Sequence, residues 1–137
     1  MKTKEEVIAT LKVFDAKVLH TGSRAICDIV PDTSDDDYVV LLPSCSIRRM
    51  FISLFLKSED FEYQSSDEQS SGDSQSILFK RREDNVNLII VHDPDHFERW
   101  DLATRTAKNM GLCASRQDRV DYFHKSLYPI DEEEIPF

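Results

Sequence analysis

Three consecutive aspartates, Asp35 to Asp37, lead directly into five apolar or aromatic residues at positions 38–42. The second run has the β-branched and aromatic density of a strand that is buried on both faces, and Pro43 ends it. Because side chains alternate along a strand, Asp35 and Asp37 are expected on one face and Asp36 on the other. Two carboxylates on one face repel each other unless a divalent cation holds them, and Mg²⁺ or Mn²⁺ suits such oxygen ligands. The pattern predicts a sheet with a cation site where this strand begins.

Two other interpretations compete with a cation site. A solvated acidic turn before a strand needs no ion, and acidic turns are common. A calcium loop of the EF-hand type is excluded, because counting from Asp32 places no glycine at the sixth position and Pro43 where a bidentate glutamate belongs. The choice between a cation site and an acidic turn depends on the residues upstream.

Length and composition are those of a globular protein. The 137 residues suit one domain, which we expect over residues 1–130 with an acidic tail over 131–137. Hydrophobic residues make up 40% and charged residues 31%, a balance far from that of disordered chains. The formal net charge of −9 argues against broad binding to nucleic-acid backbones, which requires clustered cations.

No secretory or membrane-spanning pattern is visible in the sequence. The first residues lack an apolar core of the secretory type, and no apolar run reaches the roughly 18 residues that a membrane span needs. We therefore expect a cytoplasmic protein with no membrane partner. The three cysteines, Cys27, Cys45 and Cys113, are odd in number and form no CxxC pair, which favours reduced, packed thiols.

Periodicity in the first half predicts an α/β (α+β) fold in which a mixed β-sheet packs against helices. Thr3 and Glu6 form a capping-box pattern ahead of an amphipathic helix. A short strand over 16–20 ends at a turn that contains Gly22. A second helix is expected after Ser44 or Ser46. Its residues predicted to face the sheet are Ile47, Met50, Phe51, Leu54 and Phe55.

The second half predicts a hairpin and two more helices. Residues 61–64 form a weak strand, and the polar residues 65–76 are expected to be a mobile loop. "ILFKRR" and "VNLIIVH" predict a hairpin around the turn "EDN". Asp93 and Pro94 start a helix that ends at Gly111, and a last helix opens at Ser115 and Asp118. The residues of these helices expected to face inward are Phe97, Trp100, Ala103, Ala107, Met110, Val120, Phe123 and Leu127.

The turn at Gly22 and Ser23 lies upstream of the aspartates at an interval that resembles the motif of the nucleotidyltransferase superfamily. That motif is an apolar strand, Gly-Ser, a connecting segment and Asp-x-Asp on the next strand, and "VLHTGSR" and "SDDDYVVL" resemble it closely. The resemblance covers residues 16–42, and the order of the remaining elements agrees through about residue 128. The chain looks like a minimal nucleotidyltransferase, the small single-domain kind found as antitoxin partners. Through "VNLIIVHDPDHFERWDLAT" and "RVDYF" it is also similar to short bacteriophage-encoded nucleotidyltransferase-like proteins, which implies a host cytoplasm.

The resemblance implies a site and a reaction. Gly22 and Ser23 would contact the triphosphate of an NTP, and Arg24 is a further phosphate candidate because guanidinium groups fork onto phosphate oxygens. Asp35 and Asp37 would be catalytic and would carry Mg²⁺ or Mn²⁺. The implied activity is the metal-dependent transfer of a nucleotidyl group, with AMP from ATP as the expected case, to a hydroxyl of a protein or an RNA.

The third catalytic position departs from the family pattern. The family places a carboxylate on a later strand, and in "NVNLIIV" that position is Asn87. An amide oxygen coordinates a cation, but it adds no negative charge and does not take a proton from an attacking hydroxyl. Glu83 and Asp84 are alternative third carboxylates, although both fall in the predicted turn. The alternative function is therefore a catalytically degenerate binding protein that sequesters a nucleotide or inhibits a host partner, with its acidic surface favouring a basic partner.

Three further features have both a structural and a functional interpretation. "KRR" at 80–82 is favoured as a charged strand end over a device that steers phosphates. His92 and His96 flank Pro94, which starts a helix, so capping and surface roles are favoured over metal binding. Trp100 lies on the inward stripe of its helix, which favours core packing over base stacking.

Overall fold

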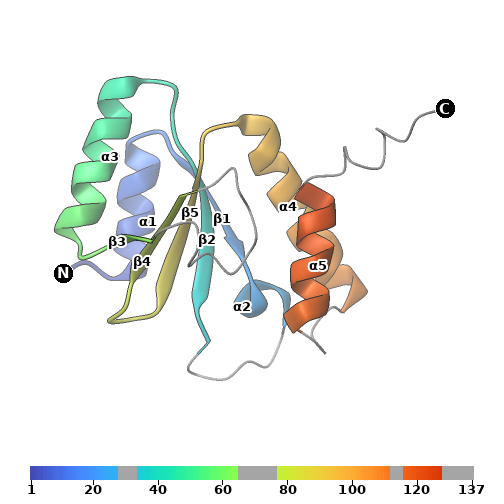
Figure 1. Cartoon of the computed structure of the whole chain (residues 1–137). Coiled ribbons are helices and arrows are strands. Elements are labelled where there is room, and N and C mark those ends of the chain that lie inside the picture. Colours follow the sequence, from blue (N-terminus) through green and yellow to red (C-terminus); the bar gives the residue numbers. More distant parts are fainter. Residues whose placement is uncertain (28–33, 65–76, 112–115, 128–137) are drawn as a thin grey trace.

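The computed structural model describes residues 1–27, 34–64, 77–111 and 116–127. These residues form one mixed five-stranded sheet with helices on both faces, as predicted (Figure 1). The predicted loop over 65–76 and the acidic tail over 131–137 lie outside the described residues. In spatial order the strands are β1 (Lys17–Thr21), β2 (Asp36–Leu41), β5 (Val86–Val91), β4 (Ile77–Arg81) and β3 (Glu62–Gln64).

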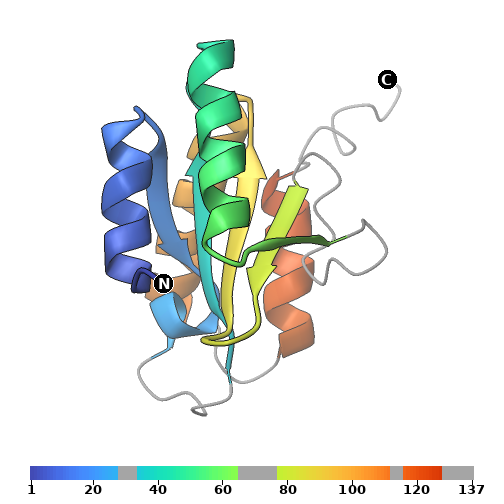
Figure 2. The ribbon, with the colours of Figure 1, turned by 90° about the vertical axis from the view of Figure 1, so that its left-hand side faces the viewer.

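The helices divide between the two faces of the sheet. On one face lie α1 (Lys4–Val13) and α3 (Ser46–Ser58), and on the other lie α4 (Pro94–Met110), α5 (Arg116–Leu127) and the short α2 (Ser23–Ile26) (Figures 1 and 2). Each face of the sheet therefore has its own helical cover.

Within the described part of the chain, no helix is both long and apolar enough to cross a membrane.

Strand pairing brings polar residues together at one end of the sheet. β2 and β5 run parallel, whereas the other three neighbouring pairs are antiparallel. In this register Asp37 lies between Thr21 of β1 and Asn87 of β5, and Lys80 of β4 is opposite Asn87. Because residues directly opposite each other point to the same face, four strands contribute to a single polar cluster.

Alternation along the strands produces two apolar cores, one on each side of the sheet. Val39 and Ile89 belong to the core beneath α4 and α5, whereas Val40 and Leu88 belong to the core beneath α1 and α3. Trp100 is buried in the first core with its ring centroid 5.3 Å from that of Phe123, so the predicted packing role is confirmed. β2 and β5 supply fully buried residues to both cores, which explains the continuous apolar runs at 38–41 and 88–91.

Helix α1 begins as the sequence predicts. The Thr3 hydroxyl accepts a hydrogen bond from the Glu6 backbone N–H at 3.2 Å, and the Glu6 carboxylate accepts one from the Thr3 N–H at 3.1 Å. This capping box satisfies two backbone donors that a helix start leaves without partners. Val7 and Leu11 are buried against the sheet. The cap therefore fixes the residue at which α1 begins.

The predicted inward face of α3 is mostly wrong, because only Phe55 of the predicted residues packs against the core. Ile52 and Leu56 are the buried residues of this helix. The helix is apolar on most of its circumference, so spacing alone allows several faces to be chosen as the inner one. Contact with Ile90 and its neighbours in the second core selects the face of Ile52 and Leu56. Four residues that were expected to face the sheet are instead more than 45% exposed: Ile47, Met50, Phe51 and Leu54.

Three smaller expectations also fail. Met110, in the last turn of α4, is exposed rather than inward, because the helix ends there at the left-handed Gly111 beyond the edge of the core. His96 is buried rather than at the surface, because the first turn of α4 already lies on the sheet. Cys27 is disulfide-bonded, contrary to the expected reduced thiol, whereas Cys45 is free and exposed.

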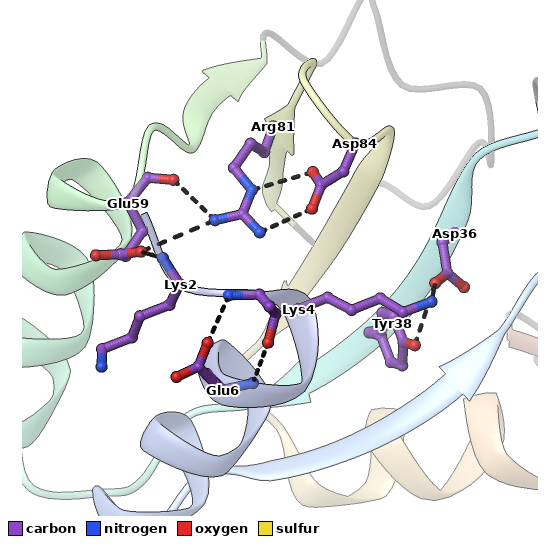
Figure 3. A network of polar contacts seen from close by, with 9 residues as sticks. Lys2, Lys4, Glu6, Asp36, Tyr38, Glu59, Arg81 and Asp84 are labelled. Atoms are coloured by element: carbon purple, nitrogen blue, oxygen red, sulfur yellow. Dashed lines mark hydrogen bonds and ion pairs between the residues drawn. The ribbon is translucent and has the colours of Figure 1, made fainter.

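A buried arginine joins β4 to the end of α3 (Figure 3). Arg81 is 1% exposed, and its guanidinium donates to Asp84 in a forked pair at 3.0 and 2.8 Å and to the Glu59 carbonyl at 3.2 Å. The guanidinium carbon also lies 4.8 Å from the ring centroid of Phe61. Asp84 therefore pairs with Arg81 on the side of the sheet that α1 and α3 cover. It does not supply a third carboxylate beside Asn87. Within "KRR", Arg81 has the structural role, and only Lys80 faces the polar cluster.

Candidate active site

Gly22 connects β1 to α2 and lies directly against Asp37. Its φ of 76° is in the left-handed region, and a Cβ on this residue would lie 2.3 Å from Asp37 Oδ2. Both facts require glycine here, the first because other residues rarely adopt this angle and the second because a side chain would overlap the carboxylate. The Gly22 carbonyl accepts hydrogen bonds from Ala25 and Ile26, which hold the turn in place. The backbone of the turn therefore lies directly against the Asp37 carboxylate of β2.

The two predicted aspartates share one donor. Asn87 Nδ2 donates to Asp35 Oδ2 at 3.0 Å and to Asp37 Oδ1 at 2.8 Å. Asp36 points to the opposite face, where it contacts Lys4 and His20. The expected alternation of the three aspartates is thus confirmed, and Asn87 lies where the sequence placed the third member of the set.

The electrostatics of the cluster are unfavourable without a ligand. Burial raises the pKa of Asp37 to about 6, against the hydrogen bond from Asn87, and the neighbouring charge of Asp35 raises it further. Lys80 Nζ lies 3.5 Å from Asp35 Oδ1 and partly compensates the charge of that carboxylate. One ammonium and one amide therefore face two buried or half-buried carboxylates.

Asn87 carries an unused acceptor in the same place. Its side chain is 8% exposed, and its Oδ1 atom is buried with no hydrogen-bond partner among the described residues. A buried acceptor without a partner is costly, on the order of 1–3 kcal/mol. Rotating the Asn87 amide by half a turn would point Oδ1 at the two carboxylates. A cation between the carboxylates would favour this orientation, whereas without a cation the oxygens would repel one another.

The cluster lies at one end of a cavity of about 280 Å³. Thr21, Gly22 and Ser23 line it together with Asp35, Asp37 and Asn87. The other end is apolar and is lined by Ile89, Trp100 and Phe123, with Arg119 of α5 at its wall. The cavity has the size of a small-molecule site at the lower end of the usual range, with a charged end and an aromatic end.

Not every predicted residue reaches this cavity. Arg24 is not one of its lining residues, and its Nε donates instead to the Ser34 carbonyl at 3.0 Å, just before Asp35. Several lining residues were not predicted as site residues, among them Thr21 and Arg119. Thr21 directly precedes the Gly-Ser turn, so its place in the sequence could have indicated that it lines the site. Its hydroxyl lies 2.7 Å from that of Thr104 in α4. Arg119 had no such signal, because only the packing of α5 brings it to the site.

The residues present fit a divalent cation of the hard, oxygen-binding kind. Asp35 and Asp37 supply two carboxylates within reach of one shared group, and Asn87 Oδ1 supplies a third oxygen after rotation of its amide. No group of three or more histidine, cysteine, aspartate or glutamate side chains suited to a metal occurs in the part of the chain that the structure describes. The site is thus a pair of carboxylates with an amide, one charge short of a three-carboxylate site.

Solved structures of other proteins have the same arrangement of strands and helices. The conserved protein GrpB from Enterococcus faecalis is similar over 95% of this chain and 88% of its own, with a TM-score of 0.55 and 15% identity. A cytoplasmic RNA terminal U-transferase and the RNA terminal uridylyl transferase Cid1 each match 77% of this chain with a TM-score of 0.51 and 16% identity. This chain spans only 30% and 33% of those two proteins. Neither a family model nor a curated protein matches the sequence.

The fold of this chain is therefore of the nucleotidyltransferase-like class. Its mixed sheet carries Gly22 and Ser23 after the first strand and Asp35 and Asp37 at the start of the second, as the resemblance implied. The narrower likeness to minimal nucleotidyltransferases and to bacteriophage proteins stays a prediction, as does the cytoplasmic location.

Proposed function

We propose that this protein is a metal-dependent nucleotidyltransferase that moves a nucleotidyl group, with AMP from ATP as the expected case, to a hydroxyl of a protein or an RNA. The observation that carries this proposal is the meeting of the Gly22-Ser23 turn with Asp35 and Asp37 at the charged end of one cavity. The similarity to terminal uridylyl transferases supports the fold for such a reaction, while ATP as the expected substrate rests on the resemblance of the sequence motif.

Each residue of the cavity has a role in this proposal. Asp35 and Asp37 would hold Mg²⁺ or Mn²⁺, which when bound neutralises charge on the phosphates of the NTP. Gly22 leaves the backbone of the turn open to those phosphates, and Ser23 offers its N–H and hydroxyl to them. Lys80, now beside Asp35, is near enough to the same end of the cavity to contribute positive charge.

A second function is favoured by Asn87. Its amide already bridges Asp35 and Asp37, so it links the two carboxylates as a cation would, although it carries no charge. A site with one carboxylate fewer binds cations more weakly and lacks a proton acceptor for the attacking hydroxyl. The second candidate is therefore a protein that binds a nucleotide without transferring it, or that uses its acidic surface on a basic host partner.

Labelled ATP separates the two functions. The protein is incubated with isotopically labelled ATP and Mg²⁺ or Mn²⁺, alone, with RNA and with lysate, and labelled product is counted. We expect product from the wild type, none from Asp35→Ala or Asp37→Ala, and an unchanged amount from Asp101→Ala, which removes an aspartate of α4 outside the cavity. Absence of product in every mixture, together with NTP binding in calorimetry, would establish the second function instead.

Asn87→Asp is the decisive variant for the weakened site. It restores a third carboxylate, so we expect Mn²⁺ affinity to rise on the order of tenfold and labelled product to increase. In the absence of metal the same variant should unfold at a lower temperature, because three carboxylates then repel one another without the amide donor. Unchanged affinity in calorimetry would show that Asp35 and Asp37 do not share a cation.

A further inference from the structure

Asp36, between the two site aspartates, is held by three donors on the far side of the sheet. It is 4% exposed. The Lys4 ammonium of α1 forms an ion pair with Oδ2, and the Tyr38 hydroxyl donates to the same oxygen at 3.2 Å (Figure 3). His20 Nε2 of β1 lies 2.7 Å from Oδ1. Three elements, α1, β1 and β2, therefore converge on one carboxylate, and we call these four residues the Asp36 clamp.

The clamp residues also support one another. The rings of His20 and Tyr38 are stacked with centroids 4.7 Å apart, so the two donors keep a fixed relation. Burial alone would raise the pKa of Asp36, but the hydrogen bonds from Lys4 and His20 hold it below its usual value. Lys4 is the first residue of α1, directly after the Thr3 cap. The capping box therefore fixes the backbone from which the Lys4 side chain extends.

The backbone at Asp36 is held as well. Its N–H donates to the Asn85 carbonyl at 2.8 Å, which joins the start of β2 to the turn between β4 and β5. Asn85 has a φ of 56°, which places this carbonyl at the end of a tight turn. The side chain and the backbone of Asp36 are thus both anchored, while Asp35 and Asp37 on either side point to the cavity.

We propose that the Asp36 clamp is the positioning device of the site: Lys4, His20 and Tyr38 fix Asp36 and thereby set the spacing of Asp35 and Asp37. The link is covalent and short, because the three aspartates are consecutive and alternate between faces. A shift or rotation of Asp36 moves both neighbours, and a pair of ligands must be held closely to share a cation. This inference rests on the proposed function for its purpose but not for its geometry.

A purely electrostatic role predicts the opposite result from a positioning role. Removing the Lys4 ammonium takes positive charge away from the sheet end, so electrostatics alone would strengthen cation binding at Asp35 and Asp37. Loss of positioning would weaken it. Tyr38→Phe removes a neutral hydroxyl and keeps the ring against His20, so only positioning predicts an effect. The sign of the change therefore decides between the two.

The first test needs no metal. The side-chain amide of Asn87 bridges Asp35 and Asp37, so its NMR signals report the spacing of the two carboxylates. We expect these signals to move toward those of a solvated amide in Lys4→Met and Tyr38→Phe. They should stay unchanged in the matched controls Lys12→Met, on the same helix, and Tyr63→Phe, on the exposed edge strand. Unchanged Asn87 signals in both clamp variants would overturn the inference.

The second test measures Mn²⁺ binding by electron paramagnetic resonance. We expect Kd to rise about tenfold in Lys4→Met and Tyr38→Phe, with Lys4→Arg partly restoring it. A lower Kd in Lys4→Met, or an unchanged Kd in both, would overturn the positioning role. A wild type that binds no Mn²⁺ would contradict the proposed function, and the Asn87 signals would then decide the clamp alone.

Discussion

The contact between Gly22 and Asp37 shows how closely single residues determine this site. The turn after β1 requires a left-handed residue, and the Asp37 carboxylate occupies the space that any side chain would need. Sequence reasoning predicted both residues and the shared face of Asp35 and Asp37. It did not predict that Asn87 bridges the carboxylates, because that contact follows from the parallel register of β2 and β5.

Gly22→Ala should disrupt cation binding more than stability. The new Cβ would displace Asp37, so we expect Mn²⁺ affinity to fall at least about tenfold in calorimetry. Gly111→Ala is the matched control, because Gly111 also has a positive φ but has no atom within 4 Å of a new Cβ. Both variants should lose about 1 kcal/mol or more of unfolding free energy from backbone strain. Equal Mn²⁺ binding in the two variants would show that Asp37 is not a ligand.

The raised pKa of Asp37 predicts the pH dependence of the site. A cation binds the ionised carboxylate, and burial raises its pKa to about 6, so affinity should increase as pH rises through about 6 and then level off. The change should be roughly tenfold between about pH 5 and pH 7. The same shift makes the protonated native form the favoured one, so the contribution of Asp37 to stability declines as pH rises from about 4 to 6. A Kd for Mn²⁺ that is flat across this range would contradict the assignment.

At the scale of elements, helix ends were easier to predict than helix faces. The capping box of α1, the Asp93 cap of α4 and its left-handed end at Gly111 all occur as the sequence indicated. These signals are local, because a cap involves residues three or four positions apart. No local signal indicated the inner face of α3, because a helix that is apolar on most sides is oriented only by the surface on which it packs.

Paired truncations test which face of α3 is inner. Leu56 is 1% exposed and Leu54 is 57% exposed, although both are leucines of the same helix. Leu56→Ala should lower the unfolding free energy by about 2–5 kcal/mol through lost burial and a cavity. Leu54→Ala should change it by less than about 0.5 kcal/mol. Chemical denaturation measures both, and similar losses would mean that the outer face of α3 is covered in solution.

At the scale of the whole molecule, the two faces of the sheet have different tasks. The face toward α4 and α5 holds the cavity, and the face toward α1 and α3 holds the Asp36 clamp and the buried Arg81. Because β2 and β5 separate these faces, a change on one side reaches the other only through the strands themselves. Outside the Asp36 clamp, stability and cation binding should therefore be separable by substitution on the face toward α1 and α3.

Arg81→Ala tests this separation. The guanidinium satisfies Asp84 and the Glu59 carbonyl and packs on Phe61, so its loss should lower the unfolding free energy by about 3 kcal/mol. Mn²⁺ binding should be unchanged at temperatures where the variant is folded, since no atom of Arg81 lines the cavity. The adjacent exposed Arg82→Ala is the control and should alter neither quantity. A parallel loss of Mn²⁺ affinity in Arg81→Ala would show that Arg81, which lies outside the clamp, also acts on the site across the sheet.

Most elements of this protein, and the face on which each aspartate lies, were predictable from the chain alone, because strand alternation, helix caps and the Gly-Ser turn depend on neighbours along the chain. The resemblance to the nucleotidyltransferase motif also pointed to Asn87 as a site residue. Three-dimensional packing was needed to show that Asn87 donates to both carboxylates, that Lys80 rather than Arg81 faces them, and that three elements hold Asp36. Apart from Tyr38, which is two positions from Asp36, these contacts join residues 16 or more positions apart, and strand register and helix packing, which no local pattern specifies, bring them together.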